Sequence, residues 1–107
     1  GEGRAALLIM SGVLIGADEA LDIGLVDSVY PPDELLDKTL EIARTIASKS
    51  PVALQAAKES ILAARRMPLD DGLKIERAWF GLLFSTEDKE EGVGALQENR
   101  EPEFTGR

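Results

Sequence analysis

Prolines divide the sequence into stretches of helical length, and this division constrains the fold more than any other feature. Pro31-Pro32 ends one region, while Ser50-Pro51 and Met67-Pro68 each separate two stretches in which apolar residues recur every three or four positions. Ser followed by Pro is a helix-start signal, because Ser caps the first turn and proline fits the first helical position. Proline inside a helix would break it, so we expect separate helices on either side of each proline.

Helical spacing of apolar residues extends over most of the chain, and the signal for strands is almost absent. The expected helical stretches are residues 5–10, a brief helical turn at 17–22, and four longer helices at 33–49, 51–66, 69–83 and 86–97. Gly12 and Gly24 are expected to stop the first two, and Ser85 to cap the last, with Asp88 three positions later. Only residues 26–30 suggest a short extended segment. We therefore predict an all-α fold of about five antiparallel helices, forming one domain over residues 1–107.

Cysteine and histidine are both absent, and their absence excludes several kinds of chemistry. The chain can have no disulfide, no cysteine-based zinc site, no cysteine nucleophile and no catalytic imidazole. We therefore predict no metal site. Acid–base chemistry would have to use a carboxylate, a lysine or the single tyrosine, Tyr30.

The excess of acidic over basic residues limits the kinds of partner that the chain can bind. The net charge is −8 at pH 7, which argues against binding to nucleic acid or to anionic membranes. No apolar run reaches the length of about 18 residues that a membrane span needs. The first residues do not have the pattern of a signal peptide, so a cytoplasmic location is expected. An anionic ligand would need a local basic pocket or one supplied by another chain.

Paired carboxylates are the only candidates for acid–base catalysis, and none is convincing. The pairs are Asp18 with Asp22, Asp33 with Asp37, Asp70 with Asp71, and Glu90 with Glu91. A catalytic carboxylate needs a pKa raised by burial in an apolar pocket. These pairs lie at helix starts or on polar faces, where the helix dipole and water keep carboxylates ionised. We therefore predict no catalytic residue in this chain.

Two other clusters allow more than one interpretation. Arg65-Arg66 is expected to close a helix, where cations interact favourably with the helix dipole, although a phosphate clamp is an alternative. Trp79, Phe80 and Phe84 form an aromatic cluster that suits either a core or a subunit interface. From the residues alone, the chain is an acidic helical domain without an evident active site.

Motifs in a fixed order take the interpretation further. Residues 11–31 contain Ser-Gly, Ala-Asp-Glu-Ala and Gly-Leu-Val before a proline, and residues 50–58 contain Ser-Pro-Val-Ala-Leu followed by Ala-Lys. The sharpest motif is residues 84–104, with Phe-Ser-Thr-Glu-Asp, Glu-Gly, Glu-Asn-Arg and Pro-Glu-Phe. In this order and at this spacing, the motifs resemble those of the enoyl-CoA hydratase/isomerase (crotonase) superfamily across essentially the whole chain.

The resemblance implies that the chain is the C-terminal helical region of such an enzyme. The N-terminal ββα spiral core would precede Gly1. In hydratases of this family, that core carries two glutamates that activate water for addition to a trans-2-enoyl thioester, and two backbone N–H groups that stabilise the oxyanion. The catalytic glutamates would thus lie upstream of Gly1, and the chain alone is expected to be inactive. The resemblance further implies self-association, as a trimer or a dimer of trimers, and closure over the CoA end of an acyl-CoA. CoA would be part of the substrate, with no covalently bound cofactor.

Two residues are implied to contact CoA. Phe84 matches a position that packs near the adenine or the pantetheine, in its own or a neighbouring subunit. Asn99 matches a position usually held by a lysine that approaches the CoA phosphates; an asparagine can donate hydrogen bonds there but carries no charge. Arg100 would take the place of that lysine only if its side chain points toward the CoA phosphates. Two alternatives stay open, a crotonase-type isomerase and a non-enzymatic helical module for protein interaction.

Overall fold

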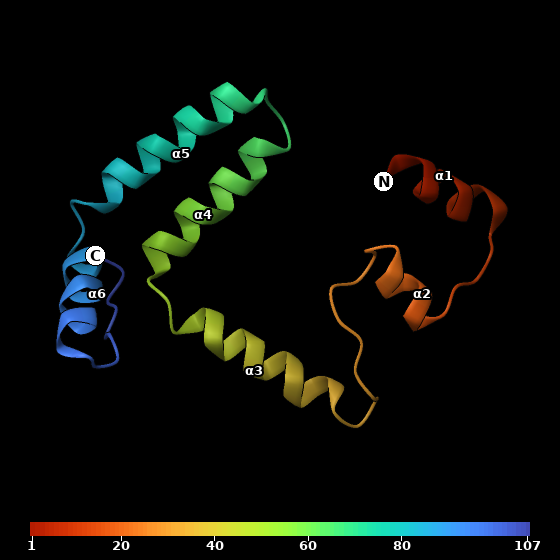
Figure 1. Ribbon diagram of the computed structural model, residues 1–107, viewed down its shortest axis with the longest axis horizontal. Helices are drawn as coiled ribbons and strands as arrows, with labels where there is room; N and C mark the ends of the chain where they lie inside the picture. Colours follow the sequence, from red (N-terminus) through yellow and green to blue (C-terminus); the bar gives the residue numbers. More distant parts are fainter. The chain divides into compact units, whose positions relative to one another are not determined.

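The computed structural model describes residues 1–107 and contains six helices and no strand (Figure 1). The helices are α1 (Glu2–Ser11), α2 (Ala17–Asp22), α3 (Leu35–Ala47), α4 (Pro51–Ala64), α5 (Leu69–Leu83) and α6 (Glu87–Glu98). The predicted all-α fold is confirmed, and residues 26–30 form no strand. The chain divides into two compact units, residues 1–40 and 41–107, with the division inside α3. None of the helices combines the length and the apolar character needed to cross a membrane.

Glycines follow the ends of α1 and α2, as the sequence predicts. Gly12 follows α1 in the left-handed region at φ 66°, and its N–H donates to the Leu8 carbonyl. Gly24 follows α2 at φ 70°. The Leu25 N–H then donates to the Ala20 carbonyl over 2.8 Å, which closes the turn. Glycine suits both positions because a side chain would strain a backbone with positive φ.

Hydroxyl groups cap two helices of the second unit. Ser50 Oγ accepts from the Ala53 N–H at 3.3 Å, and Pro51 follows it at the first helical position, as predicted. The expected cap of the last helix is one residue off: Thr86 Oγ1 accepts from the Lys89 N–H at 3.2 Å, whereas Ser85 Oγ donates to the Leu82 carbonyl. Thr86 has the extended backbone that an N-cap requires. Asp88 is therefore not the capping partner that the sequence suggested.

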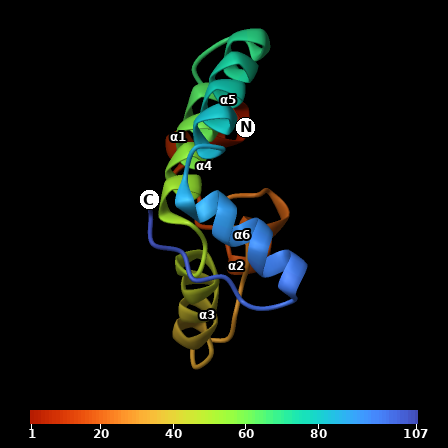
Figure 2. The same ribbon diagram turned by 90° about the vertical axis from the view of Figure 1, so that its left-hand side faces the viewer.

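Small residues allow α4 and α5 to pack as an antiparallel hairpin, side by side in Figures 1 and 2. Ala56 and Ala63 of α4 are buried, with 3% and 9% of their surface exposed. Gly72 of α5 lies so near α4 that an added Cβ would be 3.7 Å from the Cα of Ala64. The small residues of α4 and α5 thus allow the two helices to approach closely.

Large apolar side chains stay exposed in both units. The buried apolar residues are all alanines, and no large side chain is fully buried. Leu14, Met10 and Leu96 expose 96%, 87% and 82% of their surface. A few buried alanines remove little apolar area from water, and burial of larger side chains is what stabilises most domains of this size. The fold therefore presents apolar surface of the kind that other protein normally covers.

Candidate functional site

The second unit contains an apolar groove of about 550 Å³. It lies among the start of α4, the end of α5, α6 and the residues after α6, and we call it the aromatic groove. Its lining residues are Lys49, Ser50, Ala53, Phe80, Leu83, Phe84, Thr86, Asp88, Lys89, Gly92, Val93, Leu96 and Phe104. Phe84 is thus brought into a groove, together with two lysines.

Phe84 is held by neighbours on two sides while much of its ring stays accessible. The Phe80 and Phe84 ring centroids lie 5.0 Å apart at 65°, an edge-to-face arrangement. Lys89 Nζ lies 5.2 Å from the centroid of the Phe84 ring, within the range of a cation–π contact. Phe84 is still 56% exposed. Trp79, the third member of the predicted cluster, is not among the residues that line the aromatic groove.

Asn99, the other residue implied to contact CoA, lies outside the groove lining. It caps the end of α6 with φ 53° and ψ 47°, and it is the one non-glycine residue with positive φ. Asparagine tolerates this left-handed conformation better than most residues. The structure therefore gives Asn99 a local role as a helix cap, and its contact with CoA stays a prediction.

Asp88 joins segments that are far apart in the sequence. It is buried, with 3% of its surface exposed, and its Oδ2 accepts from Ser50 Oγ at 2.6 Å. The N–H groups of Thr105 and Gly106 donate to it at 2.7 and 3.1 Å, and the Asp88 N–H donates to the Arg107 carbonyl. The Ser50 hydrogen bond, and after it those from Thr105 and Gly106, hold the pKa of Asp88 below its ordinary value despite burial. This carboxylate is therefore kept ionised.

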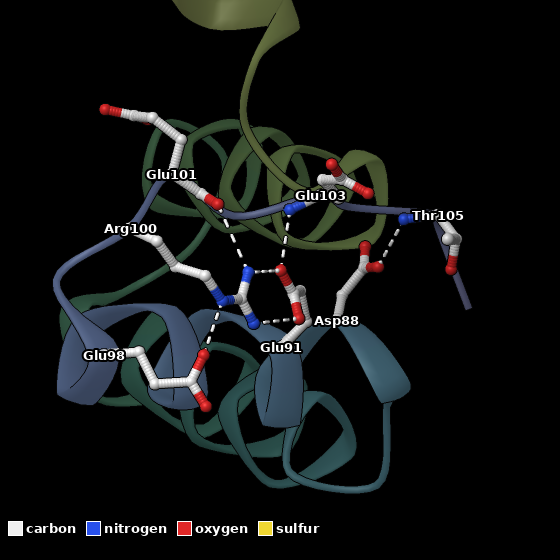
Figure 3. Close-up of polar contacts among 7 residues, drawn as sticks. All are labelled: Asp88, Glu91, Glu98, Arg100, Glu101, Glu103 and Thr105. Carbon is white, nitrogen blue, oxygen red and sulfur yellow. Dashed lines mark hydrogen bonds and ion pairs between the residues drawn. The ribbon is translucent and has the colours of Figure 1, made fainter.

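Glu91 and Arg100 form a bidentate ion pair, shown in Figure 3. The guanidinium donates to the two Glu91 oxygens at 2.6 and 2.9 Å, and Arg100 Nε donates to Glu98 at 2.7 Å. The Glu103 N–H donates to Glu91 at 2.8 Å. Arg100 and then the Glu103 N–H lower the pKa of Glu91 from 4.5 to about 2. Arg100 is thus turned toward carboxylates rather than toward a phosphate.

Sequence reasoning missed both carboxylate clusters. Helical spacing indicates Glu91 only as one of a solvated pair with Glu90, and Asp88 only as a capping partner three positions after Ser85. The pKa values of Asp88 and Glu91 are lowered, whereas a general acid needs a raised one. The clusters therefore hold the residues after α6 in place and give no sign of acid–base catalysis.

Acid should loosen the Glu91 contact. Because its pKa is lowered on folding, this contact stabilises the structure fully above about pH 4.5 and is lost as the pH falls toward 2. The amide resonance of Glu103, followed by NMR, should therefore shift with a midpoint well below pH 4.5. In Glu91→Gln the resonance should lack this transition and show a changed position already at neutral pH. A midpoint near 4.5 in the unaltered chain would contradict the prediction.

Comparison with known proteins identifies the family. The profile of the enoyl-CoA hydratase/isomerase family matches residues 1–107. The chain therefore belongs to the enoyl-CoA hydratase/isomerase family.

Similar proteins include named hydratases and solved structures. The 2,3-dehydroadipyl-CoA hydratase of Escherichia coli strain K12 is 41% identical over 107 residues, which are all of this chain and 42% of the relative. The short-chain-enoyl-CoA hydratase of Clostridium acetobutylicum is 42% identical over 103 residues, 96% of this chain and 40% of the relative. The crystal structure of an enoyl-CoA hydratase from Bacillus anthracis matches with a TM-score of 0.94 at 40% identity, over 98% of this chain and 41% of that one. The chain thus spans about two fifths of the length of the relatives it matches.

Proposed function

We propose that this chain is the C-terminal helical region of an enoyl-CoA hydratase. In the complete enzyme, an N-terminal part preceding Gly1 carries the catalytic glutamates and adds water to trans-2-enoyl-CoA. Residues 1–107 join subunits and close over the CoA end of the substrate, and no covalently bound cofactor takes part. The hydratase names of similar proteins from two organisms support this reaction over double-bond isomerisation.

The aromatic groove is the observation that carries the proposal. The accessible Phe84 ring offers a flat apolar surface, and the ammonium of Lys89 lies next to it. This combination suits the adenine end of CoA, because a base stacks on an aromatic ring while a cation attracts the nearby phosphates. In a chain with a net charge of −8, such a local cation matters for binding an anion. Asn99 is retained as a hydrogen-bond donor toward the phosphates, from a position outside the groove.

Exposed apolar surface supports the part of the proposal that concerns assembly. Leu36 and Ile46 of α3 expose 68% and 52% of their surface. Apolar patches of this kind typically mark interfaces with other protein. The proposed partners are accordingly further copies of the protein and its acyl-CoA substrate.

Replacing Phe84 tests the proposal in the complete natural protein. Phe84→Ala should raise the KM for crotonyl-CoA by about tenfold, since base–aromatic stacking contributes about 1–3 kcal/mol, while kcat changes by less than about twofold. The measurement is steady-state hydration, followed as loss of the enoyl-thioester absorbance. Leu82→Ala is the matched control, because Leu82 is an exposed apolar residue near the end of α5, two positions before Phe84, and does not line the groove.

The substrate in this assay also separates the alternatives. Turnover of a 3-enoyl-CoA with none of the 2-enoyl-CoA would identify an isomerase instead of a hydratase. Absence of turnover and of CoA binding in the complete protein would favour a helical interaction module. An unchanged KM in Phe84→Ala would contradict the role given to the aromatic groove.

A further inference from the structure

The residues after α6 return along that helix instead of leaving the second unit. Figure 2 shows this segment, residues 100–107, running back toward the start of α6, and we call it the tail. The hydrogen bond from the Asp88 N–H to the Arg107 carbonyl fixes its far end at the first turn of α6. Two groups of contacts hold the tail, one at Glu91 and one at Asp88 (Figure 3).

The two groups of contacts differ in exposure. Arg100 is exposed and Glu91 is half-buried, so water and salt weaken their attraction. Asp88 and Ser50 are buried, with 3% and 8% of their surface exposed. Without the Asp88 carboxylate, the Ser50 hydroxyl and the N–H groups of Thr105 and Gly106 would lose an acceptor in a place that water reaches poorly. The Asp88 contacts are therefore the stronger anchor of the tail.

The same anchor determines where Phe104 lies. Phe104 directly precedes Thr105, whose N–H is bound by Asp88. The Phe104 ring packs on Gly92 of α6, where an added Cβ would lie 3.4 Å from Phe104 Cε1. On the other side of the anchor, Gly106 packs on α4, where an added Cβ would be 3.5 Å from Pro51 Cγ. The tail is thus seated on both helices, and Phe104 lines the aromatic groove.

We infer that Asp88 is a positioning residue: with Ser50 it pins the tail so that Phe104 forms one wall of the aromatic groove. The groove is made of segments that are distant in the sequence, from Lys49 to Phe104. Asp88 accepts hydrogen bonds from two of these segments, from Ser50 before α4 and from Thr105 in the tail. Release of the tail removes the Phe104 wall and leaves the groove wider and more exposed to water. Asp88 lies in the groove lining with only 3% of its surface exposed, and in this role it acts through the tail.

Hydrogen exchange in the complete natural protein tests the anchor without reference to catalysis. In Asp88→Asn, the peptide that contains the Thr105 and Gly106 amides should exchange about tenfold faster or more, because a neutral amide with a single acceptor oxygen replaces the charged carboxylate. Ser50→Ala should give a smaller increase in the same peptide. Glu90→Gln is the matched control, since Glu90 is an exposed carboxylate in the first turn of α6. Unchanged exchange in both Asp88→Asn and Ser50→Ala would overturn the inference.

Kinetics test the effect on the groove, and this second readout rests on the proposed function. Asp88→Asn and Phe104→Ala should each raise the KM for crotonyl-CoA by about three- to tenfold, with kcat within about twofold. The KM of the double variant should not exceed the higher of the two single-variant values, because both changes remove the same wall of the groove. Additive effects on KM, or a fall in kcat and thermal midpoint with KM unchanged, would show a general structural role and overturn the inference.

The two readouts separate failure of the inference from failure of the proposed function. If the unaltered complete protein has no turnover, the proposed function fails and the exchange result alone decides the role of Asp88. If it has turnover, exchange and KM must both respond for the inference to stand. Should Asp88→Asn fail to fold, Ser50→Ala and Phe104→Ala provide the same two measurements.

Discussion

At micromolar concentrations, the 107-residue chain by itself should form oligomers instead of remaining a monomer. The physical reason is the exposure of large apolar side chains, which include Leu7, Ile9 and Met10 of α1 at 61%, 80% and 87%. Monomeric proteins rarely expose contiguous apolar patches beyond a few hundred Å², because association removes that area from water at about 25 cal/mol per Å². Light scattering over a range of protein concentrations measures the average mass directly.

A charge placed on the apolar face of α3 should weaken this association. In Leu36→Glu, a carboxylate replaces a side chain that is 68% exposed, so the change costs little in the isolated fold but opposes burial in an interface. Thr45→Glu is the control, because Thr45 lies on the opposite, polar side of the same helix by helical spacing. A monodisperse monomer at high concentration, or equal effects of both variants, would contradict the prediction.

Features set by neighbouring residues were predictable from the sequence. Pro51 and Gly12 determine backbone geometry locally, so the start of α4 and the end of α1 follow from one or two residues. The cap of α6 was missed by one position because Ser85 and Thr86 are both good caps, and only the backbone conformation of Thr86 decides between them.

Features set by distant residues were not predictable from spacing or composition. Ser50 and Asp88 are 38 positions apart, and no local pattern connects them. The fold of the tail likewise depends on Asp88 and on Glu91, whose partners follow after the end of α6. Phe84 was identified through the resemblance to a family, whereas the groove around it became evident only from the packing of three helices and the tail. Asn99 was identified in the same way, and the structure adds its role as a helix cap.

The 107-residue chain should not hydrate crotonyl-CoA, whereas the complete natural protein should. The chain has no histidine, and Asp88 and Glu91, its clustered carboxylates, have lowered pKa values and accept hydrogen bonds from the tail. A carboxylate that stays ionised this firmly is a poor proton donor. Enzymes typically accelerate their reactions by about a millionfold or more, so the difference between the two proteins should be at least of that order. Both are assayed at equal molar concentration by loss of the enoyl-thioester absorbance.

Background hydration must be separated from weak catalysis in this comparison. Glu91→Gln and Asp88→Asn in the 107-residue chain provide the control, because they alter the two carboxylates whose pKa values the fold changes most clearly. If the catalytic glutamates lie upstream of Gly1, as proposed, both variants should give the same background rate as the unaltered chain. Turnover by the chain that disappears in one of these variants would place catalysis within residues 1–107. It would contradict the proposal that the catalytic glutamates lie upstream of Gly1.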